Sequence, residues 1–170
     1  IKTRGEGLME FVRHYPSLTH LPTPVLEEVQ LGPFLEKILS LIDPECKKND
    51  ISLKLEIRER VQTSMDPQLI EQVLLNLIRN SIQALEGIPT GKSISIYAGS
   101  DVTGVQISIR DNGCGIDIED MDNIFIPFYT TRTKGSGIGL SFSKQIMRLH
   151  NGQIAVKSDV DKGAEFILRF

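Results

Sequence analysis

Two amide side chains at helical spacing are the first groups in this 170-residue chain that could do chemistry. Asn76 and Asn80 are one helical turn apart, so their side chains point to the same side of a helix. Amide oxygens are neutral ligands that a hard cation such as Mg²⁺ accepts beside waters and phosphates. An isolated Asn-x-x-x-Asn pair is more often a plain polar helix surface. The pair therefore indicates a metal site only together with other motifs.

A carboxylate lies among glycines in the second motif, Asp-Asn-Gly-Cys-Gly at residues 111–115. Gly113 and Gly115 have no Cβ, so a flat ligand can approach the backbone closely. The Asp111 carboxylate could accept a hydrogen bond from the exocyclic amine of adenine, and a base without that amine would leave it unpaired. A simple Asp-Asn-Gly turn is the alternative. The doubled glycine and the apolar Ile116 favour a base-binding site.

The third and fourth motifs are Phe-Ile-Pro-Phe at residues 125–128 and Gly-Ser-Gly-Ile-Gly-Leu at residues 135–140. The glycines lead into a predicted helix, and exposed N–H groups at a helix N-terminus bind phosphate. Arg132 and Lys134, in the polar stretch between the two motifs, could close over a triphosphate as a lid. The glycine motif fits neither a dinucleotide fingerprint nor a P-loop. Together, the four motifs predict a pocket that binds ATP through Mg²⁺.

A long helix must carry the two asparagines. Its start is encoded by Asp66 and Pro67, an N-cap carboxylate followed by a proline at the first helical position. We predict this helix over residues 66–86, with Gly87 stopping it. One stripe of the helix carries the amides, and the adjacent stripe is apolar and faces a core.

The remaining elements follow from hydrophobic periodicity. Alternation predicts strands over residues 51–57, 61–65, 93–98, 105–110, 153–158 and 164–170, with 61–65 as the hairpin partner of 51–57. Helical spacing predicts helices over residues 1–19, from residue 33 toward residues 47–49, and over 138–150. We expect residues 1–24 to form a helix end with a proline-rich linker and residues 25–170 to form one domain. The element order predicts an α+β fold, with helices on a mostly antiparallel or mixed sheet.

Composition excludes several classes of protein. The formal net charge is -3 with acids and bases interspersed, which gives no basic face for nucleic acid. No apolar run approaches the ~18 residues that a membrane span needs. Cys46 and Cys114 are too few for a disulfide framework, which indicates a reducing, cytoplasmic setting, and we expect Cys114 to be inert packing. The chain begins with Ile1, which suggests a fragment of a longer protein.

With these motifs in this order, the chain resembles the catalytic domains of sensor histidine kinases. Residues 66–80 resemble their N box, 111–115 the G1 box, 125–128 the F box, 135–140 the G2 box and 163–166 the last glycine box. The match covers roughly residues 30–170, and an ordered set of five boxes is highly specific. The stretch Pro-Phe-Tyr-Thr-Thr-Arg at residues 127–132 is most similar to the nitrogen-regulation branch.

The resemblance implies the Bergerat ATP-binding fold of the gyrase, Hsp90, kinase and MutL superfamily, a two-layer α/β sandwich. It implies that Asn80 holds Mg²⁺ and that Asp111 binds adenine, and we assign catalytic roles to Asn76, Arg132 and Lys134. The nucleotide-binding residues that we predict are Asn76, Asn80, Gln83, Ala84, Asp111, Gly113, Gly115, Ile116, Phe128, Thr131, Arg132, Lys134, Gly135, Ser136, Gly137, Ile138, Gly139, Leu140 and Ala164.

Three positions depart from the family pattern. Gln83 and Ala84 stand where many of these kinases have Lys and Tyr, so one cation near the phosphates and one ring stacked on adenine are missing. Arg132 and Lys134 must then neutralise more of the phosphate charge. Ala164 stands where a threonine often supports a water near adenine, which puts that contact in doubt.

The family also implies a phosphoacceptor histidine followed by an acidic residue, and no histidine of the chain fits. The three histidines precede Tyr, Leu and Asn, at His14, His20 and His150. We expect a solvated or packing role for His14 and only a helix-dipole contact for His150. The acceptor helix is then absent from this chain and belongs to the same kinase dimer, with a response regulator as the further partner. We expect a cytoplasmic domain whose parent protein could be anchored in the inner membrane.

Position 76 separates a histidine kinase from an ATP-hydrolysing clamp. Gyrase-like ATPase clamps have a glutamate there that activates water, and Asn76 cannot be that base. A histidine kinase, which delivers the phosphate to a protein side chain, therefore ranks above a clamp. A degenerate ATP sensor stays open because of Gln83 and Ala84.

Overall fold

The computed structural model describes residues 22–58, 60–102, 104–131 and 135–170. Its elements in chain order are β1 (Glu27–Gln30), α2 (Leu31–Lys48), β2 (Ser52–Ile57), β3 (Gln62–Met65), α3 (Pro67–Ala84), β4 (Ser93–Asp101), β5 (Gly104–Asp111), α4 (Gly139–Leu149), β6 (Gln153–Asp159) and β7 (Gly163–Arg169). The helix expected over residues 1–19 lies outside the described residues. Within the described part of the chain, no helix has the length and apolar character to cross a bilayer.

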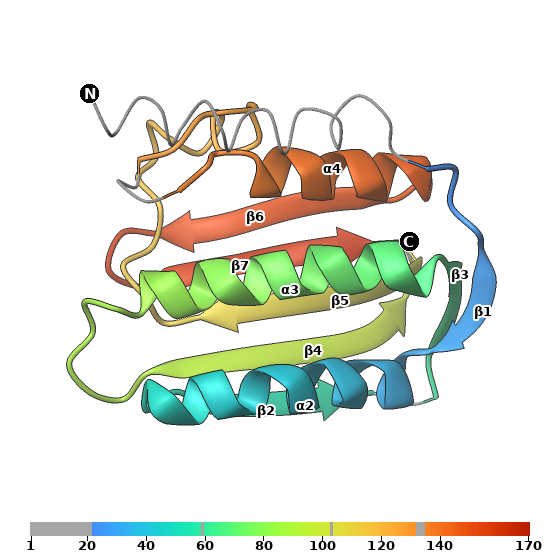
Figure 1. Ribbon diagram of the computed structural model, residues 1–170, viewed down its shortest axis with the longest axis horizontal. Coiled ribbons are helices and arrows are strands. Elements are labelled where there is room, and N and C mark those ends of the chain that lie inside the picture. Colours follow the sequence, from blue (N-terminus) through green and yellow to red (C-terminus); the bar gives the residue numbers. More distant parts are fainter. Residues whose placement is uncertain (1–21, 59, 103, 132–134) are drawn as a thin grey trace.

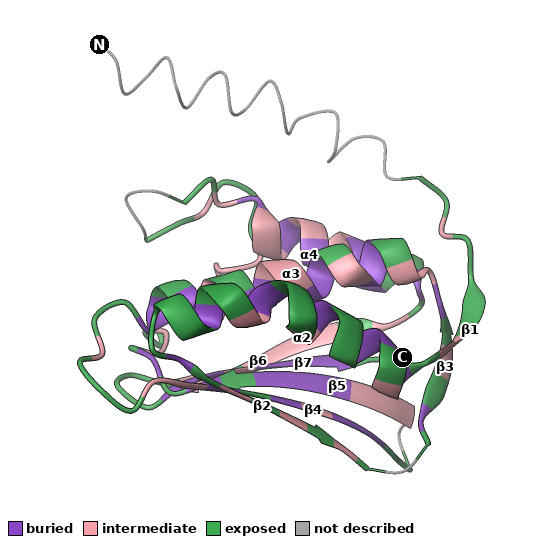
Figure 2. Ribbon diagram, turned by 60° about the horizontal axis from the view of Figure 1, so that its bottom comes forward, coloured by how far each residue is buried: buried purple, intermediate pink, exposed green. Residues whose placement is uncertain are grey.

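Five strands form one mixed sheet in the order β2-β4-β5-β7-β6. β2 pairs with β4 in parallel, and the other neighbours pair antiparallel. Helices α2, α3 and α4 cover one face of this sheet, and no described helix covers the other (Figures 1 and 2). The predicted α+β fold, a layer of helices on a mixed sheet, is confirmed.

The prediction for the strand before α3 is wrong in its pairing. β3 does not form a hairpin with β2, but pairs antiparallel with β1 in a separate two-stranded sheet. Val29 of β1 lies opposite Thr63 and packs against the hydrophobic core, which holds this ribbon to the domain. β1 has the sequence Glu-Glu-Val-Gln with a single apolar residue, so it shows no alternation that could predict a strand.

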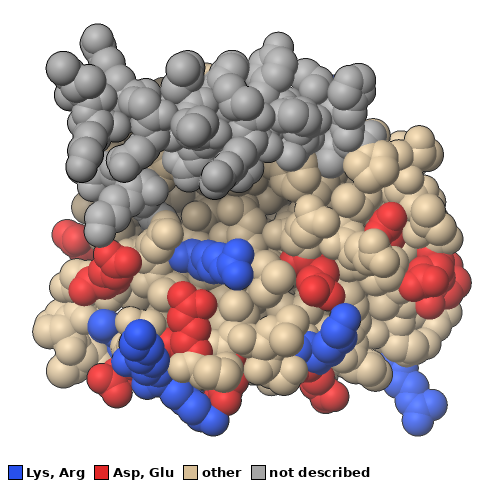
Figure 3. Space-filling model, viewed as in Figure 1, with Lys and Arg blue, Asp and Glu red and all other residues tan. Residues whose placement is uncertain are grey.

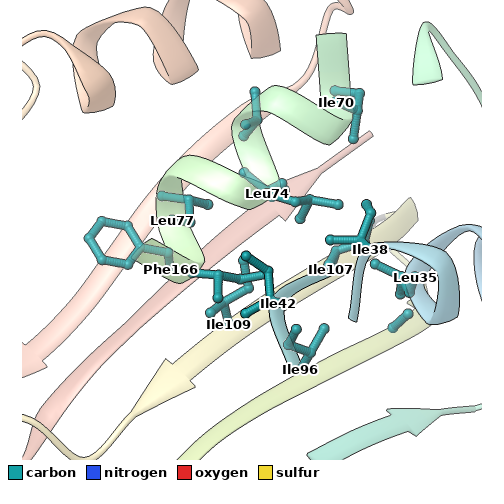
Figure 4. Packing of buried hydrophobic residues seen from close by; sticks show 14 of the residues in the cluster. Leu35, Ile38, Ile42, Ile70, Leu74, Leu77, Ile96, Ile107, Ile109 and Phe166 are labelled. Carbon is teal, nitrogen blue, oxygen red and sulfur yellow. The ribbon is translucent and has the colours of Figure 1, made fainter. Parts of the chain in front are cut away.

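The core lies between the helical layer and the sheet. Apolar side chains of α2 and α3 interdigitate there with isoleucines of β4 and β5 and with Phe166 of β7 (Figure 4). Their fully buried members contribute roughly 1.5–3 kcal/mol each by leaving water. The largest of these residues include Leu35, Ile38, Ile70, Leu74, Leu77, Ile96 and Ile107. This packing fixes α3 against the sheet and so fixes the direction of its polar residues.

Helix α3 begins as predicted and ends two residues early. The Asp66 carboxylate caps it by accepting hydrogen bonds from the N–H groups of Gln68 (3.0 Å) and Leu69 (3.1 Å), and Pro67 occupies the first turn. Leu85 is the C-cap, where residue 86 was the predicted end. Asn76 and Asn80 therefore lie in the second half of the helix, close to the end of β5.

Candidate nucleotide-binding site

Three of the four motifs line one cavity of about 460 Å³ between α3, the carboxyl end of β5, the start of β7 and the segment before α4, whereas none of residues 125–128, the third motif, lines it. Of the predicted residues, those that line it are Asn76, Asn80, Gln83, Ala84, Asp111, Gly115, Ile116, Thr131, Gly135, Ser136, Gly137, Gly139, Leu140 and Ala164. Gly113, Phe128 and Ile138 lie beside the cavity without lining it. Arg132 and Lys134, predicted as lid cations, lie outside the described residues.

A wider hollow of about 660 Å³ lies on the uncovered face of the sheet. Its lining includes Lys54 and Glu56 of β2, Arg110 of β5 and Glu165 of β7. None of the predicted site residues lines it, so we assign the nucleotide to the smaller cavity. On the face shown in Figure 3, Lys and Arg likewise lie among Asp and Glu, as the interspersed charges of the sequence predict.

Asp111 is a buried polar group of the cavity with several hydrogen-bond donors. Its side chain is buried, and one carboxylate oxygen accepts a hydrogen bond from the Ser81 hydroxyl at 2.9 Å. The other oxygen accepts from the N–H groups of Gly113 at 2.9 Å and Ala164 at 3.3 Å. A carboxylate offers about four lone-pair positions, so these donors fix the group and leave acceptor capacity for a ligand amine.

The glycines beside Asp111 are required by close packing. A Cβ on Gly113 would lie 2.7 Å from the Ala84 carbonyl oxygen, and one on Gly163 would overlap with the Asp111 backbone. Gly163 also has a φ of +86°, which disfavours any other residue. Gly113 was predicted to contact the ligand, but in the structure it packs the end of α3 against the end of β5.

The phosphate-side wall combines the asparagines with the glycine-rich segment. The Asn76 Nδ2 donates a hydrogen bond to the Ser143 Oγ of α4 at 3.0 Å, which joins the two helices. A Cβ on Gly139 would overlap with the Asn76 carboxamide, so a larger residue there would displace this carboxamide. Asn80 lies one turn further along the same wall.

The third motif lies against the fourth. The N–H of Phe128 donates to the Gly137 carbonyl oxygen at 2.8 Å, and a Cβ on Gly137 would lie 2.5 Å from the Phe128 carbonyl carbon. Phe128 has a φ of 68°, a backbone conformation that is costly for an aromatic residue. The residue is 47% exposed, and it is not among those that line the cavity.

Several lining residues were missed by the sequence analysis. They are Arg79, Cys114, Asp117, Asp120, Ile124, Tyr129, Thr130 and Phe166. Arg79 could have been found from its spacing to Asn76 and Gln83, which puts all three on neighbouring positions of α3. It supplies a cation to the wall where Gln83 replaces the usual lysine. Tyr129 donates a hydrogen bond to Asp120, and this carboxylate raises the pKa of the Tyr129 phenol.

Two single-residue predictions are wrong. Cys114 was expected to be inert packing, but it is exposed and lines the cavity. His150 was expected to make only a helix-dipole contact, but its ring is buried. Its Nδ1 contacts the Ile146 carbonyl oxygen at 2.8 Å, and its Nε2 accepts from the Asp66 N–H at 3.0 Å. The packing of α4 against the start of α3 creates this contact, which local sequence cannot reveal.

Comparisons with known proteins agree with this geometry. Residues 65–170 match the family of histidine kinase-, DNA gyrase B- and HSP90-like ATPases. The sensor histidine kinase ZraS of Escherichia coli K12 is 35% identical over 153 residues, which cover 88% of this chain and 31% of ZraS. The solved catalytic domain of the histidine kinase ThkA has a TM-score of 0.75 and 31% identity, covering 85% of this chain and 93% of that domain.

ThkA has also been solved in complex with the response regulator protein TrrA. That structure has a TM-score of 0.79 and 25% identity, covering 98% of this chain and 48% of the ThkA chain. The protein therefore belongs to the family of histidine kinase-, DNA gyrase B- and HSP90-like ATPases, and it has the fold of a histidine kinase catalytic domain. The chain spans about a third of the length of ZraS. The predicted resemblance and ATP as the ligand of the domain are confirmed.

Proposed function

We propose that this domain binds Mg-ATP and transfers the γ-phosphate to a histidine on the phosphoacceptor helix of its own kinase dimer. The observation that carries the proposal is the amide at position 76, whose Nδ2 is hydrogen-bonded to Ser143. A carboxylate at this position would activate water, whereas an amide cannot take a proton from a nucleophile. The phosphate is then delivered to a protein nucleophile and not to water.

The donor set of the cavity fits the proposed ligands. Asp111 has acceptor capacity for the adenine amine, and Gly115 and Gly139 line the cavity without side chains. Mg²⁺ takes few protein ligands and keeps waters and phosphate oxygens, which suits a wall with the neutral amides of Asn80 and Asn76. In this proposal Asn80 is the metal ligand, and Mg²⁺ supplies charge neutralisation to the phosphates.

The residues of the domain act mainly by orientation and charge. Phosphoryl transfer needs an in-line approach of the nucleophile and stabilisation of the equatorial oxygens, with little covalent chemistry from the protein. Arg132 and Lys134 are the proposed cations for the γ-phosphate, and Arg79 adds a cation on the helix side. Asn76 orients the phosphate and metal side of the nucleotide.

Two other functions remain as alternatives. A conformational clamp of the gyrase type would hydrolyse ATP, and it is disfavoured by the amide at position 76. A degenerate ATP sensor is favoured by Gln83 and Ala84, which replace a cation and a stacking ring. Arg79 weakens this argument, because it lines the same wall as Gln83.

The proposed partners follow from the kinase assignment. They are a response regulator, as in the ThkA complex, and a second copy of the full-length protein that completes a homodimer. A nucleic-acid partner is not part of the proposal, because the interspersed charges give no basic face. A cytoplasmic location is proposed for the domain, and membrane anchoring is proposed only for the parent protein.

Transfer of radiolabelled γ-phosphate from ATP to a separately supplied dimerisation hairpin tests the proposal. We expect label on the hairpin histidine with the wild-type chain, and at least about tenfold less with Asn80→Ala or Asp111→Ala. Transfer that survives both substitutions would overturn the site assignment. Steady ATP hydrolysis without an acceptor would favour the clamp, and tight ATP binding without transfer or hydrolysis would favour the sensor.

A further inference from the structure

A buried hydroxyl joins the two helices that carry the phosphate-side wall. Ser143 lies on the inner face of α4 with an exposed fraction of 0%. Its Oγ donates a hydrogen bond to the Gly139 carbonyl oxygen at 3.0 Å and accepts one from the Asn76 Nδ2 at 3.0 Å. Ser143 does not line the cavity, and it belongs to none of the motifs that predicted the site.

The direction of the hydrogen bond from Ser143 to Gly139 decides the direction of the one between Ser143 and Asn76. A serine hydroxyl has one proton, and the Ser143 proton goes to the Gly139 carbonyl oxygen. Toward Asn76 the hydroxyl can therefore only accept. The oxygen and the NH₂ of a carboxamide have nearly equal size, so a hydrogen-bond partner must select between its two orientations. Ser143 selects the orientation in which the NH₂ faces α4.

The selected orientation places the Asn76 oxygen on the side of Gly139. This oxygen occupies the space that a Cβ on Gly139 would need. Gly137 and Gly139 are thus glycines for different reasons. Gly137 has a φ of +68°, whereas Gly139 is a helical residue outside the left-handed region, and the atoms nearest to a Cβ there belong to the Asn76 carboxamide.

We infer that Ser143 is a positioning residue that holds the Asn76 carboxamide with its oxygen toward the metal and phosphates. The inference rests on the proposed function, in which Asn76 would orient the phosphate and metal side of the nucleotide beside the Asn80 ligand. Without the Ser143 hydroxyl, nothing on α4 selects between the two orientations of the Asn76 carboxamide. The carboxamide then also samples the orientation that would turn its NH₂ toward the cation. Partners behind a metal site typically change metal affinity 10–100-fold.

The chain offers a matched control on the same helix. Ser141 is also buried, and its Oγ donates to the Ile138 carbonyl oxygen at 2.8 Å in the same type of bond. Ser141→Ala removes a buried hydroxyl and a backbone contact from α4, as Ser143→Ala does. The Asn76 contact is the difference between the two variants.

The first measurement is the ratio of ATP affinities with and without Mg²⁺, obtained by calorimetry on the whole chain. We expect Ser143→Ala to lower this ratio about tenfold, with the Mg²⁺-free affinity nearly unchanged. Ser141→Ala leaves the ratio at the wild-type value. In an Asn76→Ala background, Ser143→Ala has no further effect, because the group that it positions is gone. Equal ratios for the two serine variants, or an equal loss in the Asn76→Ala background, would overturn the inference.

The second measurement needs neither metal nor nucleotide. The side-chain NH₂ resonances of Asn76, assigned by their loss in Asn76→Ala, report its hydrogen bond to Ser143. We expect Ser143→Ala to shift them and Ser141→Ala to leave them in place; unshifted resonances in Ser143→Ala also overturn the inference. If the proposed function is wrong, the results have another pattern. Asn80→Ala and Asn76→Ala then leave the ratio of ATP affinities with and without Mg²⁺ unchanged, while the Asn76 resonances still shift in Ser143→Ala.

Discussion

Asp66 and Asp111 each accept three hydrogen bonds from described residues of the chain, and they have different roles. Asp66 accepts from the N–H groups of Val25, Gln68 and Leu69 at 2.9–3.1 Å. Asp111 accepts from Ser81, Gly113 and Ala164 at 2.9–3.3 Å. The first carboxylate joins the segment before β1 to the start of α3, and the second lies in the cavity near the end of α3.

The two carboxylates differ in role because of their surroundings, since their hydrogen-bond donors are similar in number and distance. Asp66 lies outside the cavity, and its backbone N–H is also used, by the buried His150 ring. Asp111 is buried at 3% exposure and faces a cavity whose glycines keep the backbone bare. A well-bonded carboxylate is thus a stabilising group in one place and a recognition group in the other. Substitutions should separate the two roles.

The largest expected effect is the loss of ATP binding at Asp111. Hydrogen bonds to charged groups contribute about 1.5–3 kcal/mol. Asp111→Ala should therefore lower the affinity for ATP, measured by calorimetry, on the order of 100-fold. Asp111→Asn keeps the shape and part of the bonding, and we expect a smaller loss. Asp66→Ala is the control with unchanged affinity. A variant of Asp111 that folds and binds ATP normally would contradict the comparison.

The next effect is a loss of stability at Asp66. Asp66→Ala removes the N-cap of α3 and the Val25 contact, so we expect the free energy of unfolding to fall by about 2 kcal/mol in urea titrations. Asp66→Asn retains an acceptor oxygen and should lose less. ATP affinity should stay within about twofold in both variants. A parallel loss of affinity would show that the two carboxylates act as one unit.

The features around the two carboxylates that depend on neighbouring residues in the chain could be predicted from the sequence. The Asp66-Pro67 start of α3 and the glycines after Asp111 are short patterns with one physical meaning each, and both are in place. The convergence of three of the four motifs on the cavity was predictable, because resemblance to a known family supplied the long-range arrangement.

The parts that the sequence could not predict depend on contacts between distant elements. β1 has too little apolar pattern to be recognised, so the pairing partner of β3 was assigned to the wrong strand. Ser81, Ser143 and His150 are single polar residues whose partners lie 30 to 84 positions away. Nothing in their local sequence distinguishes them from solvated side chains.

A smaller effect sharpens the Asp111 side of the comparison. Ser81→Ala removes the hydroxyl that donates to Asp111 at 2.9 Å and leaves the two backbone donors. One neutral donor is worth about 1 kcal/mol, so we expect ATP affinity to fall roughly fivefold. Ser40→Ala, which removes an exposed hydroxyl bonded to the Lys37 carbonyl oxygen, is the control. An unchanged affinity for Ser81→Ala would mean that the backbone donors alone orient Asp111.

The smallest effect is the pH dependence that Asp66 gives to stability. Partial burial alone would raise the pKa of Asp66, but the N–H donors of Val25, Leu69 and Gln68 together hold it below the ordinary value. A carboxyl group with a lowered folded-state pKa stabilises the fold above its unfolded pKa of about 3.9 and loses that contribution as pH falls through the folded value. The unfolding free energies of wild type and Asp66→Asn should therefore converge below about pH 4. Urea titrations between pH 7 and 3 measure this difference, and a constant gap over that range would mean that Asp66 acts through its shape and not through its charge.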